Sequence, residues 1–304
     1  MKRICLIGGG HGTSRLLKGF KDKDVSLDII VTSSDNGGHS GELIKEFNIP
    51  ALGDLRMVLE SVLNKPLLEF MSYRFKHLHG KDSVSLGNLM LASLVLEKGN
   101  VKGMLNEVNE LVDEKYKFHL SNCEYIELEA LKYDGECVVG ESSIGEVCGI
   151  KEVFLKKEGE VDKGVIEAIL NADIIVLSFG SFYTSLGAVL ANKEIAFAIN
   201  ESKAELVYVP NLVNQKETSD YVLENYVDYL ERVINRKIDR VIVSGSRVKR
   251  RIAKKYLVNG RKVVVNKDIR SNYRFYPLLV IEDDKLRHNV DYLAKIIIGE
   301  DRLG

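Results

Sequence analysis

Short runs of hydrophobic residues recur along the chain, and each run is bounded by glycine, asparagine, serine or charged residues. They cover residues 3–7, 27–32, 173–177, 206–209, 240–243 and 262–265. Near-continuous hydrophobic strands of this length are typical of a parallel sheet that is covered on both faces. Helical patterns lie between them, at residues 15–20, 55–63, 89–97, 165–170 and 221–234. This alternation predicts a doubly wound α/β fold with a mainly parallel sheet and helices on both faces.

The pattern changes between about residue 118 and residue 160. Segments 124–128, 136–139 and 151–154 resemble hairpin strands, and Asp134-Gly135 is a turn signal between two of them. We therefore predict a small antiparallel insertion in this region. Since no low-complexity linker divides the chain, we expect residues 1–304 to form a single domain.

The overall charge argues against a polyanionic partner. The chain has 43 Lys and Arg against 44 Asp and Glu, a formal net charge of -1. A nucleic acid or an anionic membrane would therefore not be attracted broadly. Residues 232–274 depart from this balance, because they contain 15 basic and two acidic residues, a net of +13. This segment either draws in an anionic nucleotide or forms a solvated basic face.

The cysteines and the longest uncharged segment bear on location. Cys5, Cys123, Cys137 and Cys148 form no Cys-x-x-Cys pair, which favours free thiols in a reducing compartment. Residues 174–191 carry no charge over 18 residues, but they include four Ser or Thr and two Gly. We interpret them as a buried strand, a turn and a helix start. The sequence thus predicts a cytoplasmic protein without a membrane span.

A glycine-rich loop follows the first predicted strand and precedes a helix. It consists of Gly8, Gly9, Gly10, His11 and Gly12. Glycines let the backbone approach a diphosphate, and the amides of a helix N-terminus donate hydrogen bonds to it. The spacing is neither a strict G-x-G-x-x-G nor a P-loop. A tight strand-to-helix turn is the alternative interpretation.

A second polar loop, residues 32–41, follows the second predicted strand. Both loops are expected at the carboxyl edge of the sheet, where open α/β proteins bind ligands. Asp35 is a candidate to contact a ribose hydroxyl, to bind a metal ion or to act as a base. A role as a turn-forming residue is equally open.

Two further loops have the same character. Asp54 is expected to cap a helix that begins at Leu55. Arg56 in the first turn of this helix is unfavourable for the helix dipole, so a nearby anion or carboxylate would compensate. Residues 178–185 follow another strand and offer four hydroxyls and a glycine, which is a further possible anion cradle. Several such loops at one sheet edge point to a ligand with a diphosphate.

Taken together and in order, these loops and some later segments form a set of motifs. The motifs are Ile7-Gly8-Gly9-Gly10-x-Gly12, Asp35-x-Gly37-Gly38-x-Ser40-Gly41, Gly53-Asp54-Leu55-Arg56, Ser85-Leu86-Gly87-Asn88-Leu89, Gly140-Glu141-Ser142, Gly180-Ser181-Phe182-Tyr183-Thr184-Ser185, Asn211-Leu212 and Leu286-Arg287-His288-Asn289. The set resembles the CofD-like superfamily over nearly the whole chain. Within it, the chain is similar to the bacterial gluconeogenesis factors (YvcK-like proteins).

The resemblance implies a Rossmann-like core and two functional precedents. Gluconeogenesis factors are binders of UDP-sugars such as UDP-N-acetylglucosamine that influence cell-wall synthesis, cell shape and carbon metabolism. CofD enzymes transfer a phospholactyl-type group from a guanosine diphosphate adduct to a deazaflavin alcohol, with Mg²⁺. In this chain His11 replaces a common Thr and Asn36 stands where a second Asp is usual. The Asn36 change should weaken Mg²⁺ binding, because it removes one hard oxygen anion.

The first hypothesis is therefore a regulatory protein that binds a nucleotide-sugar. Residues 8–12 and 180–185 would hold the diphosphate, and Asn211 would contact the ribose or the base. Arg287 would pair with phosphate or sugar, unless it is a solvated surface residue. The full set of expected nucleotide-binding residues is Gly8, Gly9, Gly10, His11, Gly12, Asn36, Gly37, Arg56, Asn88, Gly180, Ser181, Tyr183, Thr184, Ser185, Asn211 and Arg287.

The second hypothesis is a Mg²⁺-dependent 2-phospho-L-lactate transferase. Asp35 and Asp54 would then be the catalytic residues and the metal ligands, and the metal would neutralise charge on the diphosphate. A nicotinamide-dependent dehydrogenase ranks well below both, because the glycine spacing is wrong. We also expect a homo-oligomer, with cell-wall synthesis proteins as possible partners and no nucleic-acid partner.

Overall fold

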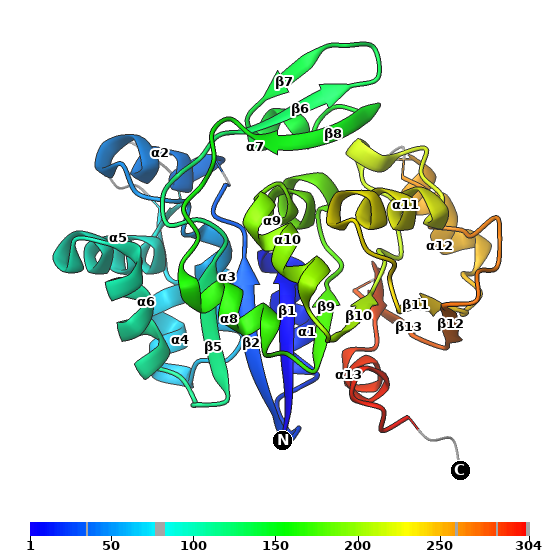
Figure 1. Cartoon of the computed structure of the whole chain (residues 1–304), viewed down its shortest axis with the longest axis horizontal. Coiled ribbons are helices and arrows are strands. Elements are labelled where there is room, and N and C mark those ends of the chain that lie inside the picture. The colour runs from blue at the N-terminus through cyan, green and yellow to red at the C-terminus, as the bar shows by residue number, and fades with distance from the viewer. Residues whose placement is uncertain (35, 77–82, 259–260, 284, 302–304) are drawn as a thin grey trace.

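A seven-stranded parallel sheet forms the centre of the protein. The computed structural model describes residues 1–34, 36–76, 83–258, 261–283 and 285–301. The sheet has the order β12-β11-β10-β9-β1-β2-β5 (Figure 1). Its strands are β1 (Lys2–Gly8), β2 (Val25–Val31), β5 (Tyr116–Leu120), β9 (Ile174–Leu177), β10 (Glu205–Tyr208), β11 (Arg240–Ser244) and β12 (Tyr273–Tyr276). The predicted doubly wound sheet is confirmed.

Strand β1 lies in the middle of the sheet because both of its neighbours pair with it in parallel. Ile4 is in register with Leu27 of β2 on one side and with Ile174 of β9 on the other. The chain first proceeds from β1 to β2 and β5, and then crosses to β9 and continues to β12. The direction of winding therefore reverses between β1 and β9.

Helices cover both faces of the sheet, and the alternation of side chains along the strands divides the core in two. Ile4 and Leu6 belong to one buried cluster with residues of α1, α3, α5, α6 and α13, whereas Cys5 and Ile7 belong to a second with residues of α8, α10 and α11. The helices are α1 (Gly10–Lys18), α2 (Gly38–Phe47), α3 (Gly53–Glu60), α4 (Lys65–Ser72), α5 (Leu86–Lys98), α6 (Val101–Glu110), α7 (Glu141–Ile144), α8 (Lys163–Leu170), α9 (Ala188–Leu190), α10 (Lys193–Glu201), α11 (Leu223–Ile234), α12 (Arg250–Val258) and α13 (Val290–Ile298).

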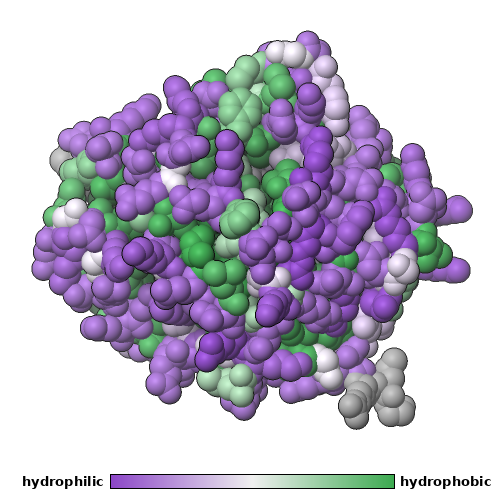
Figure 2. All heavy atoms as spheres, in the orientation of Figure 1, coloured by the Kyte–Doolittle hydropathy of each residue, from purple (hydrophilic) through white to green (hydrophobic). Residues whose placement is uncertain are grey.

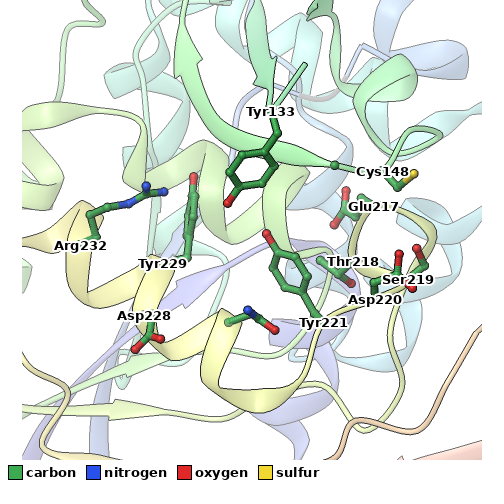
Figure 3. Close-up of a pocket in the computed structure, with 12 residues that line it drawn as sticks. Tyr133, Cys148, Glu217, Thr218, Ser219, Asp220, Tyr221, Asp228, Tyr229 and Arg232 are labelled. Atoms are coloured by element: carbon green, nitrogen blue, oxygen red, sulfur yellow. The ribbon is translucent and has the colours of Figure 1, made fainter. Parts of the chain in front are cut away.

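A small antiparallel sheet, β7-β6-β8, lies above the carboxyl ends of the parallel strands (Figure 1). Its strands are β6 (Leu128–Lys132), β7 (Cys137–Val139) and β8 (Ile150–Leu155). The predicted antiparallel insertion is thus present, but the segment 124–128 was placed too early, since β6 begins at Leu128. Residues 118–120 belong to β5 of the main sheet. The sheet faces α11 across a pocket (Figure 3).

Residues 262–265 do not form the predicted strand. They make an isolated bridge between Val213 and Val263, and their backbone bonds residues 212, 214 and 223 instead of a sheet neighbour. The edge position belongs to β12, which pairs in parallel with β11. Two short antiparallel pairs complete the description: β3 (Arg74–Phe75) with β4 (Val84–Ser85), and β13 (Leu279–Glu282) with β14 (Lys285–His288).

The uncharged segment 174–191 folds as expected from its serines and glycines. It forms β9, a turn, the π-helix η1 (Phe182–Gly187) and the short helix α9. None of the described helices has the length and apolar character needed to span a bilayer. Figure 2 shows a face covered largely by hydrophilic side chains, with hydrophobic groups between them in small areas.

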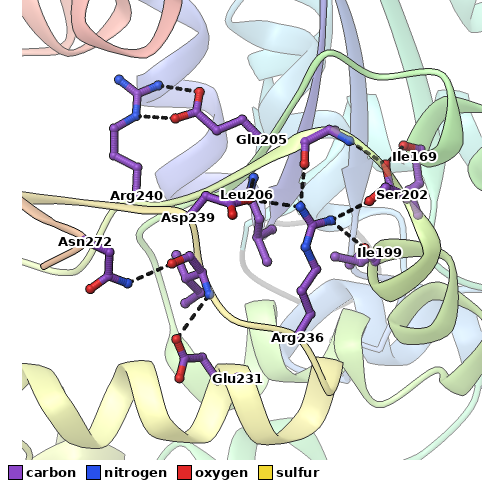
Figure 4. Close-up of polar contacts among 12 residues, drawn as sticks. Ile169, Ile199, Ser202, Glu205, Leu206, Glu231, Arg236, Asp239, Arg240 and Asn272 are labelled. Carbon is purple, nitrogen blue, oxygen red and sulfur yellow. Dashed lines mark hydrogen bonds and ion pairs between the residues drawn. The ribbon is translucent and has the colours of Figure 1, made fainter. Parts of the chain in front are cut away.

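A polar network holds the amino ends of β10 and β11 (Figure 4). Arg236 donates to the backbone carbonyls of Ile199 at 3.0 Å, Ser202 at 2.8 Å and Ala204 at 2.6 Å, and it pairs with Asp239 at 2.9 Å. These carbonyls lie at and just after the C-terminal end of α10, where a cation is favourable for the helix dipole. One side chain therefore connects α10 to the start of two strands.

Replacing this arginine should destabilise the fold. In Arg236→Met, several buried carbonyls lose their donor, which should lower the free energy of unfolding by about 3 kcal/mol. Urea denaturation is the measurement. Lys237→Met is the matched control, because within the described residues Lys237, which is largely exposed, contacts only Glu231 as an ion pair, and it should cost about 0.5 kcal/mol or less. Equal losses in the two variants would contradict the role of Arg236.

Candidate functional site

The loops after β1 and β9 lie side by side, because these strands are neighbours where the winding reverses. Open α/β sheets bind ligands at such a point, outside the carboxyl ends of the strands. The two loops pack against each other directly. A Cβ atom added at Gly12 would lie 1.5 Å from the carbonyl oxygen of Phe179, so only glycine fits there.

The other glycines of the first loop also contact protein atoms. Helix α1 begins at Gly10, so the loop forms the first turn of this helix. A Cβ atom at Gly9 would lie 2.2 Å from Oγ of Ser185, and one at Gly10 would lie 2.7 Å from Oδ1 of Asp54. The glycines of this loop thus allow close packing of the chain, and the carboxylate of Asp54 lies beside the start of α1.

Asp54 does not cap its helix as predicted. Helix α3 begins at Gly53 with Leu52 as the N-cap, and Asp54 lies in the first turn. Arg56 is buried, with 6% of its surface exposed, and it forms an ion pair with Glu60 of the same helix. Its Nε also donates to Oδ1 of Asn88 at 2.9 Å. The compensating carboxylate that the sequence called for is therefore Glu60, and Arg56 and Asn88 contact each other.

The second loop attaches the antiparallel insertion to the main sheet. Asp35 lies outside the described residues. The Oδ1 atom of Asn36 accepts hydrogen bonds from the backbone N–H and the hydroxyl of Ser142, both at 3.1 Å. Gly37 is the N-cap residue of α2. Asn36 is thus bound to the insertion rather than pointing free into solvent.

The fourth loop surrounds a carboxylate from another part of the chain. Oε1 of Glu217 accepts hydrogen bonds from the hydroxyl of Ser181 at 2.9 Å, from the N–H of Phe182 at 2.8 Å and from that of Tyr183 at 3.1 Å. Glu217 has only 2% of its surface exposed, and burial raises the pKa of its carboxyl group. The predicted anion cradle at residues 178–185 is therefore occupied by the protein's own side chain.

Two other predicted binding residues, Tyr183 and Asn211, form hydrogen bonds within the protein. Tyr183 is fully buried, and its hydroxyl donates to the carbonyl of Ile150 at 2.9 Å, so its side chain packs inside the protein. Asn211 binds both backbone groups of Gly180, accepting from its N–H at 2.8 Å and donating to its carbonyl at 2.6 Å. Gly180 has φ +150°, which favours glycine. Asn211 thus positions the fourth loop.

A cleft of about 980 Å³ opens between this loop and the C-terminal part of the chain. Lys255, Arg261, Lys285 and Arg287 contribute basic side chains to it, and Ser181 and Thr184 contribute hydroxyls. Glu141, Ser142, Gly145 and Glu146 of the insertion, with Gln215, Lys216, Glu217 and Tyr256, complete the lining. Lys216 pairs with Glu146 at 2.7 Å. Two basic residues of the segment 232–274, Lys255 and Arg261, thus line this cleft.

The three residues of the Arg-His-Asn motif have different contacts. Arg287 of β14 lines the cleft, whereas His288 is buried against Phe179 with ring centroids 4.2 Å apart. Oδ1 of Asn289 accepts from the N–H of Tyr292 and caps α13. Burial lowers the pKa of His288 to about 3, the nearby Arg15 adds to this, and a hydrogen bond to the carbonyl of Pro210 acts in the opposite direction.

Sequence reasoning did not name Glu217, Lys216, Arg261 or Lys285 as site residues. No motif contains Glu217, which lies in an ordinary polar segment, Gln215-Lys216-Glu217-Thr218. Lys285 is close in sequence to the Arg-His-Asn motif, and Arg261 lies in the basic segment. A local excess of charge was therefore the available signal for the basic residues, and nothing in the sequence pointed to the carboxylate.

Comparisons with known proteins agree with these motifs. A family model described as 2-phospho-L-lactate transferase CofD matches residues 4–284. The chain belongs to the CofD family. The "Gluconeogenesis factor" of Halalkalibacterium halodurans is 33% identical over 98% of this chain and 96% of its own length. That of Bacillus subtilis strain 168 is 32% identical, and the alignment covers 97% of each chain.

Two more relatives extend the comparison. The "Putative gluconeogenesis factor" of Deinococcus radiodurans is 31% identical over 97% of this chain, which spans only 65% of that relative's length. The crystal structure of a UPF0052 family protein from Bacillus halodurans is similar with a TM-score of 0.91 and 33% identity, covering 98% of this chain and 100% of that chain. The fold of this CofD-family chain is thus also seen in a crystal structure of a relative.

The packing of the first loop predicts a sharp difference between two glycines. Gly12→Ala should lower the free energy of unfolding by about 3 kcal/mol or more, because the Phe179 carbonyl must move. Gly145→Ala is the matched control. Its added Cβ would meet nothing closer than 3.7 Å, and we expect a change within about 0.5 kcal/mol. Thermal or urea unfolding of both variants measures this, and a tolerated Gly12→Ala would contradict the packing.

The buried imidazole predicts a pH-dependent stability. Well above pH 6.5 His288 is neutral in both the folded and the unfolded state, so it contributes nothing to the pH dependence there. As the pH falls from about 6.5 toward 3, the unfolded state binds a proton that the folded state does not, and stability falls by up to about 1.4 kcal/mol per pH unit. His288→Gln should show a shallower decline. An NMR midpoint for His288 near 6.5 would contradict the burial effect.

Proposed function

We propose that this CofD-family chain binds a nucleotide-sugar, with a UDP-sugar as the expected class, in the cleft beside the loop that contains Ser181 and Thr184. The observation that carries the proposal is the position and charge of this cleft. It lies next to the point where the winding of the sheet reverses, and Lys255, Arg261 and Arg287 line it. Guanidinium and ammonium groups form strong charge-assisted hydrogen bonds with phosphates.

The protein's own carboxylates decide where a diphosphate fits. Asp54 lies beside the start of α1, and Glu217 accepts hydrogen bonds from backbone amides of the fourth loop. A phosphate at either place would meet a like charge, which is unfavourable. The phosphates therefore fit best against Arg261, Lys285 and Arg287. Ser181 and Thr184, whose hydroxyls are hydrogen-bonded to each other, line the same cleft and suit a sugar or ribose.

A phosphate-linked group transferase is the second candidate function, favoured by the family model that matches residues 4–284. Among the described residues, Asp54 is the carboxylate of the predicted metal pair, and no group of three His, Cys, Asp or Glu is assembled for a metal ion. Mg²⁺ is often held by one or two carboxylates together with substrate phosphates, so Asp54 would suit this role. The ion would supply neutralisation of the diphosphate charge.

Several expectations remain part of this proposal. A regulatory role in cell-wall synthesis, cell shape and carbon metabolism would follow from ligand binding rather than from turnover. A cytoplasmic location, a homo-oligomeric state and contacts with cell-wall synthesis proteins are expectations of the same kind. The cleft offers a ligand site by which such a role could respond to the supply of a nucleotide-sugar.

Calorimetry with UDP-N-acetylglucosamine tests the proposal. We expect saturable heat, a strong dependence on salt concentration and about tenfold weaker binding for Arg287→Ala, since a charge-assisted contact is lost. Arg274→Ala is the matched control, because this exposed arginine on β12 does not line the cleft, and its affinity should be unchanged. Absence of heat and of a thermal shift at millimolar ligand would contradict the proposal. Consumption of the ligand during the experiment would favour the transferase.

A further inference from the structure

Helix α12 has one side toward the protein and the other toward solvent. Ile252 is buried, and the hydroxyl of Tyr256 accepts from the N–H of Leu286 at 2.8 Å, so these two side chains lie on the inner side. At about 3.6 residues per turn, the opposite side of the helix consists of Arg250, Arg251, Lys254, Leu257 and Val258. All five residues are exposed. We call them the outer face of α12.

The basic side chains of the outer face have no carboxylate partner within the described residues. None of the ion pairs there involves its two arginines or its lysine. The sequence gives a reason, because no acidic residue lies between Asp239 and Asp268. By contrast, Arg270 of the same basic segment pairs with Asp228 of α11 at 2.6 Å. The outer face therefore presents three positive charges that the described part of the protein does not neutralise.

Two hydrophobic side chains lie at the C-terminal end of this face. Leu257 has 53% of its surface exposed and Val258 has 86%. Single exposed hydrophobic residues are common, but here the two are adjacent and lie on the same side as the unpaired charges. A merely solvated basic face, one of the alternatives left open by the sequence, gives no role to them. Contact with an apolar medium would remove their surface from water.

The position of α12 leaves the outer face accessible to a large partner. Figure 1 shows α12 at the end of the molecule where β12 forms the edge of the sheet, far from the opposite edge strand β5. The inner side of the helix contributes Lys255 and Tyr256 to the nucleotide cleft. The outer face does not line that cleft, so its charges are not needed for the proposed nucleotide site.

We propose that the outer face of α12 binds the surface of an anionic lipid bilayer. Its basic side chains would lie against the lipid phosphates, and Leu257 and Val258 would enter the boundary between headgroups and acyl chains. Helices that expose both basic and apolar side chains bind bilayers in this way without crossing them. The net charge of -1 does not prevent this contact, because charges act over only about 8 Å at physiological salt and the local charge decides.

A nucleic acid would match the positive charge but not the rest of the face. Proteins that bind single strands stack the bases on aromatic side chains. The outer face contains no aromatic residue, since Tyr256 lies on the inner side. A phosphodiester backbone also offers no apolar medium to Leu257 and Val258. The composition of the face therefore favours a bilayer.

Sedimentation of the full chain with lipid vesicles tests the proposal. We expect the protein to sediment with vesicles of equimolar phosphatidylglycerol and phosphatidylcholine, to stay in solution with phosphatidylcholine vesicles, and to be partly released by added salt. No sedimentation with the anionic vesicles, or equal sedimentation with both kinds, would overturn the proposal. Binding of a single-stranded oligonucleotide in place of vesicles would assign the face to nucleic acid and would also overturn it.

A double variant assigns the binding to α12. Arg251→Gln with Lys254→Gln should weaken binding to anionic vesicles about twentyfold, since each basic residue near such a surface contributes about fivefold. Lys117→Gln with Lys203→Gln is the matched control, because it changes the net charge equally at two exposed lysines outside α12. Lys117 lies on β5, at the opposite edge of the sheet. Equal weakening by the two double variants would contradict the role of α12.

A fluorescent reporter tests the insertion of the apolar end. The protein contains no Trp, so Leu257→Trp places a single indole on the outer face. Its emission should move to shorter wavelength when anionic vesicles are added, because Trp favours the bilayer interface. Leu96→Trp on α5 is the matched control, since Leu96 is exposed to a similar degree, 50%, and its emission should not move. A shift in both variants, or in neither, would contradict the insertion.

The bilayer contact and the nucleotide site can be tested separately. Arg287→Ala should leave vesicle binding unchanged, because Arg287 lines the cleft and does not belong to the outer face. Loss of vesicle binding in this variant would place the lipid contact in the cleft and overturn the assignment. Failure of UDP-N-acetylglucosamine to bind would leave the vesicle result unaffected, since the two partners contact different basic residues.

Discussion

The contact between Gly12 and the Phe179 carbonyl is the constraint on which the rest of the site depends. It joins the loop after β1 to the loop after β9 at the point where the winding of the sheet reverses. Because a Cβ atom cannot fit there, the two loops approach as closely as backbones allow. Asn211 then fixes Gly180, and Glu217 fixes the residues that follow. The fourth loop is therefore held from three sides before any ligand arrives.

The distribution of charge decides which side of the site suits an anion. The protein places two carboxylates, Asp54 and Glu217, where the sequence suggested phosphates. Although the net charge of the chain is close to zero, the C-terminal third contributes the basic residues on one side of the cleft. The cleft lies between these residues and the fourth loop. The proposed anionic ligand would therefore be drawn to the basic side of the cleft.

The sequence predicted strands well where both faces of the strand are buried. Strands at residues 3–7, 173–177 and 206–209 were predicted within one or two residues, because both of their faces are covered and the hydrophobic run is continuous. The edge strand β12 was missed because it is only four residues long, is partly exposed and includes Arg274. Residues 262–265 carry a stronger hydrophobic run, yet they bond to loops instead.

Local sequence therefore determined the class of fold, the loops that end at one sheet edge and the family motifs. These depend on short-range patterns of burial and on residues such as Gly12 that few others can replace. Only the tertiary structure decided which groups meet. Arg56 contacts Asn88, Tyr183 faces the core, and Glu217 enters the fourth loop from 35 or 36 residues away. Such contacts depend on how distant segments pack, for which a single sequence contains no periodic signal.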